Sequence, residues 1–188
     1  MSEPGLRNWR PRAVPGARPA PGVLRDWLDE PGSLTRRLRS LAGERFAVRV
    51  IDERWARAWP DERHRLGRPG HEWFWLREVL LCDADRPLVY ARSVIPGRSL
   101  RGPLRRLRRL GRQPLGALLF GRYPVARGAI EVAALDAGSR LGARAGQWGA
   151  RPCWARRSVF RIAGRPLLVT EVFLQPLLEE LSHGHCPR

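Results

Sequence analysis

The chain has 188 residues, the size of one domain with a single hydrophobic core, and its formal net charge at pH 7 is +17. All 35 basic residues are arginine, as codon bias in a high-GC genome would produce, so the charge alone does not establish a nucleic acid or another polyanion as partner. The three cysteines form no CxxC pair and no apolar run is long enough for a signal peptide or a membrane span, so we expect a cytoplasmic protein without a disulfide framework or a zinc site.

The two ends of the chain differ in composition from its middle. Residues 1–22 hold five prolines among glycine and arginine, which predicts a disordered N-terminal arm. We expect one folded domain over residues 23–176 and a C-terminal tail over residues 177–188. The tail contains His183-Gly184-His185-Cys186, but no second cluster of metal ligands accompanies it. A frayed terminus explains this segment better than metal binding, and no metal site is expected.

The domain is predicted to begin with two helices. Apolar residues between Val23 and Leu28 indicate a short first helix. A second helix is expected to start after Ser33, which is a good N-cap, and to stop at Gly43. Its apolar stripe would consist of Leu34, Leu38 and Leu41. Helix, turn and helix therefore form the predicted start of the fold.

Strands are predicted next from alternating apolar residues. Residues 46–51 give the first strand, and a Pro/Arg/Gly-rich loop follows over residues 59–70. Residues 73–82 and 88–95 are expected to pair as a hairpin around the turn at residues 83–87. Three more strands are predicted over residues 127–135, 158–162 and 167–174.

A second helical unit is predicted between the strands. Leucines at positions 100, 104, 107 and 110 indicate an amphipathic helix that ends at Gly111, and Pro114 starts another over residues 115–120. Such a unit can act as a lid. Residues 138–152 are rich in Gly, Ala and Arg and predict a surface loop or a short extra helix. The fold class is α+β, with about six mostly antiparallel strands and helix-turn-helix lids over a buried pocket.

Two charged residues lie on the apolar faces of predicted strands. The period of two puts Arg77 on the face of Trp75 and Val79, and Glu171 on the face of Val169. Burying an uncompensated charge costs several kcal/mol, roughly, so each residue needs a partner. The two could form a salt bridge with each other, or each could be reserved for a polar ligand.

The amino-acid sequence around these strands resembles that of the chorismate pyruvate-lyase family. Six fragments agree with it in order and spacing over roughly residues 23–176. They are Trp75–Cys82, Arg92–Pro96, Leu110–Gly116 with Leu119-Phe120, Ile130-Glu131, Arg156–Ser158 and Gly164–Leu174. The resemblance implies a lyase that converts chorismate to 4-hydroxybenzoate and pyruvate, the first committed step of ubiquinone synthesis, without a cofactor. The sequence itself contains no nucleophile elbow, Gly-rich phosphate loop or dinucleotide fingerprint.

The resemblance also implies roles for individual residues. Arg77 matches the arginine that receives the ring carboxylate, and Glu171 matches the glutamate that meets the oxygen at the far end of the ring. These two are the expected catalytic residues. We expect the Glu171 carboxyl group to be protonated in an apolar cavity, so that it donates a hydrogen bond to that oxygen. Leu115 matches a position whose backbone contacts the ligand. Leu34 stands where the family commonly has Met at the pocket mouth.

Several alternatives stay open from the sequence. Arg92 could assist with the second carboxylate of the substrate, although a structural pair with Glu78 or Glu131 is the simpler reading, and Arg127 has the same ambiguity. A domain of this fold could also bind a small effector without transforming it, and the Arg-rich segment over residues 101–112 could bind nucleic acid. We expect chorismate as the only partner, no nucleic acid, no membrane insertion and a monomer.

Overall fold

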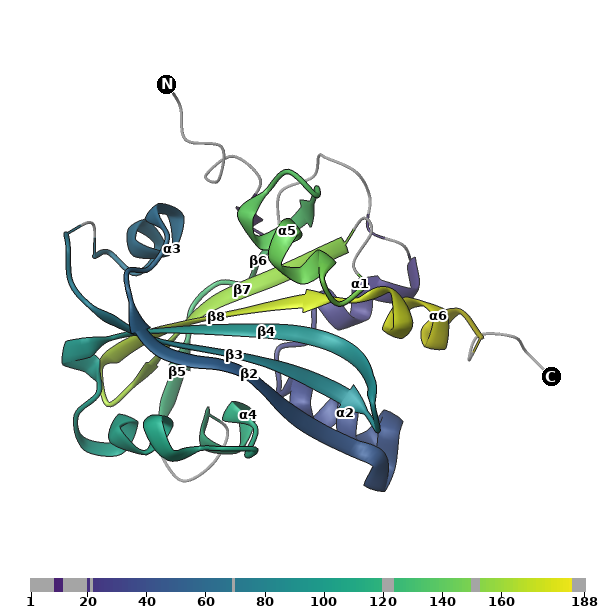
Figure 1. The fold of residues 1–188 in the computed structure, drawn as a ribbon, viewed down its shortest axis with the longest axis horizontal. Coiled ribbons are helices and arrows are strands. Elements are labelled where there is room, and N and C mark those ends of the chain that lie inside the picture. Colours follow the sequence, from purple (N-terminus) through teal and green to yellow (C-terminus); the bar gives the residue numbers. More distant parts are fainter. Residues whose placement is uncertain are drawn as a thin grey trace.

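The computed structural model describes residues 9–11, 20, 22–68, 70–119, 124–149 and 153–183, and its centre is one antiparallel sheet (Figure 1). The strands are β1 (Arg10–Pro11), β2 (Phe46–Ala56), β3 (Phe74–Asp83), β4 (Arg86–Pro96), β5 (Val125–Arg127), β6 (Glu131–Leu135), β7 (Cys153–Ile162) and β8 (Arg165–Phe173). Their order is β1-β6-β7-β8-β4-β3-β2, with β5 also paired to β7. The expected α+β class is confirmed, with an 8-stranded sheet in place of about six strands.

Helices cover both faces of this sheet. One face carries α1 (Gly22–Leu28), α2 (Leu34–Ala42) and α6 (Gln175–His183) at one end, and the 3₁₀-helix η3 (Gly102–Arg109) with α4 (Leu115–Leu119) at the other. The opposite face carries α3 (Pro60–Arg65) and α5 (Arg140–Gly146) (Figure 1). Two further 3₁₀ turns are η1 (Gly43–Arg45) and η2 (Gly97–Ser99). The sheet is therefore a middle layer with its own hydrophobic clusters on each side.

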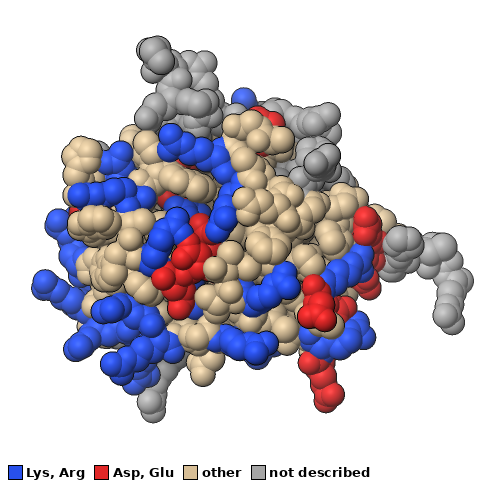
Figure 2. Space-filling model, viewed as in Figure 1, with Lys and Arg blue, Asp and Glu red and all other residues tan. Residues whose placement is uncertain are grey.

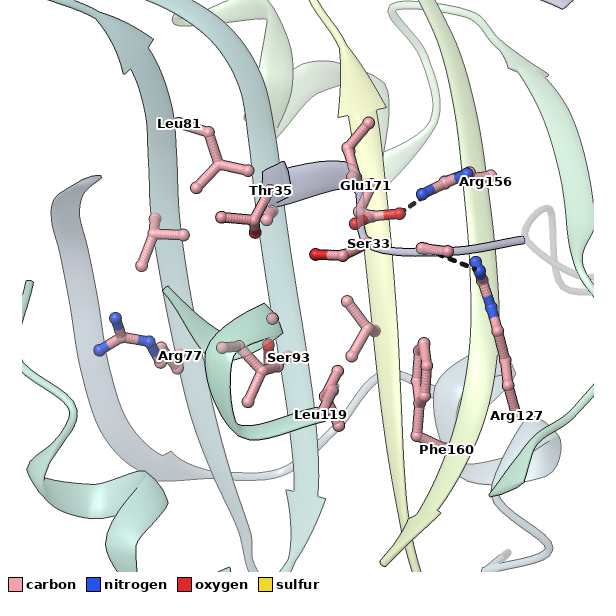
Figure 3. A pocket seen from close by; sticks show the side chains of 17 residues that line it. Ser33, Thr35, Arg77, Leu81, Ser93, Leu119, Arg127, Arg156, Phe160 and Glu171 are labelled. Atoms are coloured by element: carbon pink, nitrogen blue, oxygen red, sulfur yellow. Dashed lines mark hydrogen bonds and ion pairs between the residues drawn. The ribbon is translucent and has the colours of Figure 1, made fainter. Parts of the chain in front are cut away.

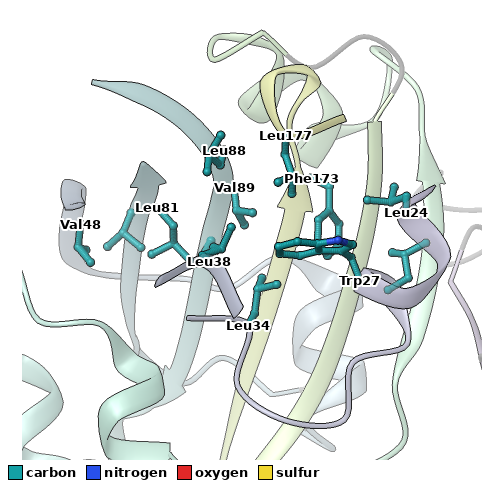
Figure 4. Close-up of a cluster of buried hydrophobic side chains, with 13 residues drawn as sticks. Leu24, Trp27, Leu34, Leu38, Val48, Leu81, Leu88, Val89, Phe173 and Leu177 are labelled. Carbon is teal, nitrogen blue, oxygen red and sulfur yellow. The ribbon is translucent and has the colours of Figure 1, made fainter. Parts of the chain in front are cut away.

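The first two helices pack where the sequence predicted them. Leu24, Trp27 and Leu28 of α1 are buried, and Leu38 of α2 is fully buried in the same cluster, which includes residues of β2, β3, β4 and β8 (Figure 4). The Ser33 hydroxyl accepts a hydrogen bond from the Arg36 amide at 3.3 Å, which confirms the predicted N-cap. The predicted stop is confirmed too, since Gly43 has a φ of 58°. Leu41 was wrongly placed in the apolar stripe, because it is 36% exposed and Ala42 is buried instead.

The strand predicted over residues 127–135 is two strands. β5 pairs with β7 at residues 160–162, whereas β6 pairs with β7 at residues 153–157. Gly128 lies between them, and its amide donates to the Val159 carbonyl at 2.8 Å. A Cβ at Gly128 would lie 3.2 Å from that carbonyl oxygen. The close approach of the two backbones lets the chain leave the ladder at this point and rejoin it one segment later.

The second helical unit differs from its prediction in geometry. The segment that carries Leu104 and Leu107 is a 3₁₀-helix rather than an α-helix. A 3₁₀-helix has three residues per turn, so leucines three positions apart lie above one another. Leu104 and Leu107 are accordingly both fully buried against the sheet. Gly111 ends the unit with a φ of 52°, as expected.

Two loops contain short helices. The predicted loop over residues 59–70 contains α3, because Pro60 begins a helix and the Glu62 side chain accepts from the Trp59 amide at 2.9 Å. The expectation of a loop there was wrong in that part. The segment 138–152 contains α5, capped by Ser139, which confirms the alternative of a short extra helix.

The ends of the chain are described only in part. Within the expected arm, β1 pairs with β6, with Arg10 opposite Val132, and most other residues up to 21 lie outside the described residues. The expected domain boundary at residue 176 falls inside α6. Leu177 of this helix is fully buried in the hydrophobic cluster that also contains residues of α1 and α2. Residues 184–188, and with them most of the His/Cys segment, also lie outside the described part of the chain.

Candidate active site

A pocket lies between the sheet and the two helical units that cover one of its faces. Its walls come from β3, β4, β7 and β8 on the sheet side and from residues 32–35 and 115–119 on the helical side. All four residues predicted for the site line it, namely Leu34, Arg77, Leu115 and Glu171, and Figure 3 shows Arg77 and Glu171 among them. The cavity measures about 40 Å³. Since an apolar cavity that takes benzene measures about 150 Å³, a ring can be bound here only after one of the covers moves.

Two rows of side chains cross the floor of this pocket. Strand pairing fixes the first row as Arg77, Ser93, Val169 and Ser158, and the second as Val79, Ala91, Glu171 and Arg156. The rows lie next to each other because residues on one face recur at every second position. The first row has Arg77 and Ser158 at its two ends, whereas the second row has the charged pair of Glu171 and Arg156 at one end and the apolar residues Val79 and Ala91 at the other.

Arg77 is 2% exposed and its guanidinium is held on the β2 side of the pocket. Nη1 donates to Glu53, and Nη2 donates to the carbonyls of Gly111 at 2.7 Å and Gln113 at 3.1 Å. Nε donates no hydrogen bond within the described residues. The guanidinium thus ties β3 to the turn that precedes α4. The alternative of a salt bridge between Arg77 and Glu171 is wrong, because each has a different charged partner.

Glu171 is paired with Arg156, the residue opposite it on β7. Arg156 Nε donates to a Glu171 carboxylate oxygen at 2.6 Å, and Arg156 itself is 1% exposed. Its Nη1 also donates to the carbonyls of Trp27 at 2.9 Å and Glu30 at 2.8 Å. A close guanidinium is the compensation that a partly buried carboxylate requires to stay charged. This cation was not part of the sequence-based expectation for Glu171, whose protonation stays a prediction.

The two covers touch each other at a glycine. A Cβ on Gly116 would lie 2.8 Å from the Thr35 hydroxyl oxygen and 2.9 Å from the Ser33 hydroxyl oxygen. Only glycine lets α4 approach the start of α2 this closely. Leu34 and Leu115 lie on the two sides of this contact, and Leu34 is 2% exposed. The covers consequently close the pocket as one surface.

Arg127 on β5 lies at the opposite side of the pocket from Arg77 (Figure 3). Its Nε donates to the Ser158 hydroxyl at 3.1 Å, and its Nη1 donates to the carbonyls of Pro31 at 2.8 Å and Glu30 at 3.1 Å. No carboxylate pairs with it among the described residues. Burial and repulsion from Arg156 lower the pKa of Arg127 to about 10.

Arg127 also borders a second hollow on the surface. This cleft of about 270 Å³ is lined by two further arginines, Arg65 and Arg161, and by no carboxylate side chain. Positive charge therefore faces both the pocket and the adjoining cleft.

Arg92 points to the other face of the sheet, away from the pocket. It is 1% exposed and pairs with Glu62 at 2.6 Å and with Glu78 at 2.5 Å. The structural pair with Glu78 is confirmed, whereas Glu131 pairs with Arg157 instead. Burial raises the pKa of Glu62. Burial would also raise the pKa of Glu78, but Arg144 and Arg92 together lower it. This charged layer stabilises the fold beneath α3 and α5.

The outer surface carries most of the positive charge. Figure 2 shows arginines gathered over the segment that contains η3. Its exposed members are Arg101, Arg105, Arg106, Arg108, Arg109 and Arg112. This distribution gives the molecule a positive field near one of the two pocket covers.

Sequence reasoning assigned no role in the site to several pocket residues. Arg156, Ser33, Thr35 and Ser93 line the pocket beside the predicted residues. A signal for Arg156 was present, because the strand period puts it on the face of Ser158 and Phe160. Its pairing with Glu171 depends on the register between β7 and β8, which the sequence did not give.

Comparison with known families gives one consistent result. The profile of the chorismate lyase family matches residues 15–181. A probable chorismate pyruvate-lyase of Methylococcus capsulatus is 46% identical over 156 residues, which are 82% of this chain and 96% of that protein. One from Halorhodospira halophila is 47% identical over 182 residues and covers 91% of each chain. The chorismate pyruvate-lyase of Yersinia enterocolitica is 38% identical over 82% of each chain.

Solved structures with a similar fold are more distant in sequence. The effector domain of PhnF from Mycobacterium smegmatis has a TM-score of 0.54 at 15% identity, over 77% of this chain and 90% of that domain. The C-terminal domain of the histidine utilization repressor from Pseudomonas syringae has a TM-score of 0.52 at 13% identity, over 70% and 93% of the two chains. These likenesses concern the fold alone.

Among the described residues, no helix is long and apolar enough to cross a membrane.

Proposed function

The chain belongs to the chorismate lyase family, and on this premise we propose that the pocket between the sheet and its two covers is where the reaction takes place. The protein converts chorismate to 4-hydroxybenzoate and pyruvate, the reaction that opens ubiquinone synthesis. The observation that carries the assignment to this pocket is that Leu34, Arg77, Leu115 and Glu171, far apart in sequence, line one cavity.

The reaction balances without water or a redox partner. The bond between ring carbon 3 and the ether oxygen breaks, and that oxygen becomes the ketone of pyruvate. The hydrogen lost from ring carbon 4 is gained by the methylene carbon of the side chain, which becomes the methyl group. The ring becomes aromatic, and this supplies driving force. The protein has to hold the substrate in a reactive conformation and stabilise charge as it moves, which is catalysis by positioning and preorganised electrostatics.

Arg77 would hold the ring carboxylate. Its Nε donates no hydrogen bond within the described residues, and Leu115 and Gly116, whose amides have no partner within the first turn of α4, line the same pocket. A carboxylate placed there would accept from Nε and from the Leu115 amide. Because Nη1 and Nη2 are fixed by Glu53 and by the turn before α4, the Arg77 side chain is already held in place before the ligand arrives.

Glu171 would contact the oxygen on ring carbon 4. One of its carboxylate oxygens is held by Arg156, and Figure 3 shows the other directed toward the pocket. With this cation beside it, Glu171 accepts a hydrogen bond from the 4-hydroxyl group rather than donating one. Arg156 does not contact the pocket ligand in this arrangement and acts as a positioning residue for Glu171.

The two covers would exclude water during the reaction. Leu34 keeps the apolar character and approximate volume of the Met that is common at this position in the family, without its sulfur.

We further infer that the protein acts in the cytoplasm as a monomer and binds no nucleic acid. The free thiol at Cys82 supports a reducing compartment, and the compositional origin of the arginines supports the absence of a nucleic-acid partner.

A single incubation tests the proposed function. The purified chain is mixed with chorismate, and pyruvate and 4-hydroxybenzoate are quantified over time. Equal amounts of both products are expected. An effector-binding domain of the same fold would bind chorismate or 4-hydroxybenzoate in calorimetry and release no pyruvate above the uncatalysed rate, and this outcome would overturn the proposal.

A further inference from the structure

Chorismate carries two carboxylates, and the pocket has one guanidinium at each side. Resting on the proposed function, we propose that Arg127 binds the carboxylate of the enolpyruvyl side chain, while Arg77 binds the carboxylate of the ring. Arg127 is then a substrate-binding residue that the product 4-hydroxybenzoate does not need.

The first reason is the position of Arg127 relative to the rows of the sheet. The row that begins with Arg77 ends at Ser158, and the Ser158 hydroxyl accepts from Arg127 Nε at 3.1 Å. Three strand spacings separate the ends of this row, which is roughly 14 Å between backbones. Figure 3 shows the two arginines on opposite sides of the pocket. The space between them suits a ring that bears a carboxylate at one end and a short anionic side chain at its flank.

The second reason is the place of Glu171 in the neighbouring row. Glu171 lies between Ala91 and Arg156, nearer to the Arg127 side of the pocket than to the Arg77 side. If Glu171 marks ring carbon 4, then ring carbon 3, which carries the ether, lies beside it. The side-chain carboxylate is therefore directed toward the wall that Arg127 forms.

The third reason is charge. Arg77 is paired with Glu53 and Arg156 with Glu171, whereas Arg127 contacts a hydroxyl, backbone carbonyls and the Phe160 ring and forms no salt bridge within the described residues. Its Nη2 donates no hydrogen bond there. A half-buried cation without a counter-charge is costly to keep, so a ligand carboxylate that pairs with it gains more than at an exposed arginine. The pocket thus has an unpaired positive charge that matches the second negative charge of the substrate.

Binding at Arg127 would also serve the chemical step. The methylene carbon of the side chain must approach the hydrogen on ring carbon 4, and a fixed side-chain carboxylate limits rotation about the ether bond. The guanidinium of Arg127 would stay paired with the side-chain carboxylate throughout the reaction, because the same carboxylate is retained in pyruvate. Arg127 therefore orients the substrate without taking part in bond breaking.

Two unreactive ligands test this proposal in calorimetry. One is 4-hydroxybenzoate, with a single carboxylate, and the other is 3-(carboxymethoxy)-4-hydroxybenzoate, which adds an anionic ether at ring carbon 3. In Arg127→Gln, we expect the affinity for the dianionic ligand to fall by about 10-fold to 100-fold, the range for a charge-assisted hydrogen bond. The affinity for 4-hydroxybenzoate should stay nearly unchanged, which also shows that the variant is folded. kcat/KM for chorismate should fall with the dianion affinity.

Two further variants separate this role from alternatives. Arg127→Lys keeps the charge and should recover part of the dianion affinity. Arg161→Gln removes an exposed arginine that borders the cleft but not the pocket, and should change neither ligand. If the Gln and Lys variants lose both ligands alike, Arg127 only holds the turn at residues 30–32, and the proposal is overturned. An unchanged dianion affinity in Arg127→Gln would also overturn it. Failure of the wild-type chain to release pyruvate would instead reject the proposed function, whatever the ratio of the two affinities.

Discussion

The pair formed by Glu171 and Arg156 is expected to affect both the stability of the fold and the rate of the reaction. In Glu171→Gln, the guanidinium of Arg156 stays buried at 1% exposure but loses its carboxylate partner. Breaking a buried pair by removing one member typically costs about 3 to 5 kcal/mol. Two backbone carbonyls still accept from Arg156, and Glu171 is 17% exposed, so we expect the lower end, about 3 kcal/mol of unfolding free energy.

Urea unfolding of a double-mutant cycle measures this coupling. The variants are Glu171→Gln, Arg156→Gln and the two together. Because the double variant leaves no unpaired buried charge, its loss of stability should be smaller than the sum of the single losses by about 1 to 3 kcal/mol. A sum that is simply additive would show that the 2.6 Å contact does not stabilise the fold.

Pyruvate release from chorismate gives the second readout of the same variants. Glu171→Gln should lower the rate by about 10-fold to 100-fold, because a neutral amide replaces a charged acceptor for the 4-hydroxyl group, and Glu171→Ala should lower it further. Glu78→Gln is a matched control, since Glu78 is a buried, arginine-paired glutamate on the opposite face of the sheet. It should lose stability and keep its kcat. If Glu171→Gln unfolds and turns over like the wild type, Glu171 is not a site residue.

Three other predictions follow from the charges of the molecule. Arg77→Ala should weaken 4-hydroxybenzoate binding by roughly 2 to 4 kcal/mol in calorimetry, and near-wild-type affinity in a folded variant would mean that the carboxylate is held elsewhere. The folded-state pKa of Glu78 is lowered, so its stabilisation is full above its ordinary pKa and is lost as the pH falls through the folded value. The stability difference between wild type and Glu78→Gln in urea should therefore shrink in acid, and a constant difference from pH 7 to pH 3, roughly, would contradict this. Added salt should lower kcat/KM for the dianionic substrate and leave kcat nearly unchanged, whereas tight duplex binding in a gel shift at physiological salt would indicate a nucleic-acid partner instead.

The sequence predicted the local structure well where short-range signals decide it. The N-cap at Ser33, the stop at Gly43 and the hairpin of β3 and β4 all depend on neighbouring residues, and all are confirmed. One local signal was missed, since Pro60 and Glu62 begin and cap α3 in the segment predicted as a loop. Two other errors arose where long-range packing decides. The break at Gly128 depends on its contact with Val159 across the sheet. The 3₁₀ geometry of η3 depends on how its leucines meet the sheet.

The sequence predicted which face of the sheet carries the site residues, but it did not predict which charged residues pair with them. The period of two put Arg77 and Glu171 on the pocket face, where the structure has them. Their charged partners, Glu53 and Arg156, come from other strands, and only the register of those strands brings them together. The same limit left Arg127 undecided, because its surroundings are carbonyls of a turn almost 100 positions earlier in the chain.

The small volume of the closed pocket has a kinetic consequence. Space of about 40 Å³ holds a few water molecules and no ring, so the conformation described cannot be the one that captures substrate. Binding must pass through a less populated open conformation, and the observed association rate constant is reduced in proportion to its population. In a stopped-flow experiment the binding rate should then rise with ligand concentration and level off at the rate at which the contact between Gly116 and Thr35 separates.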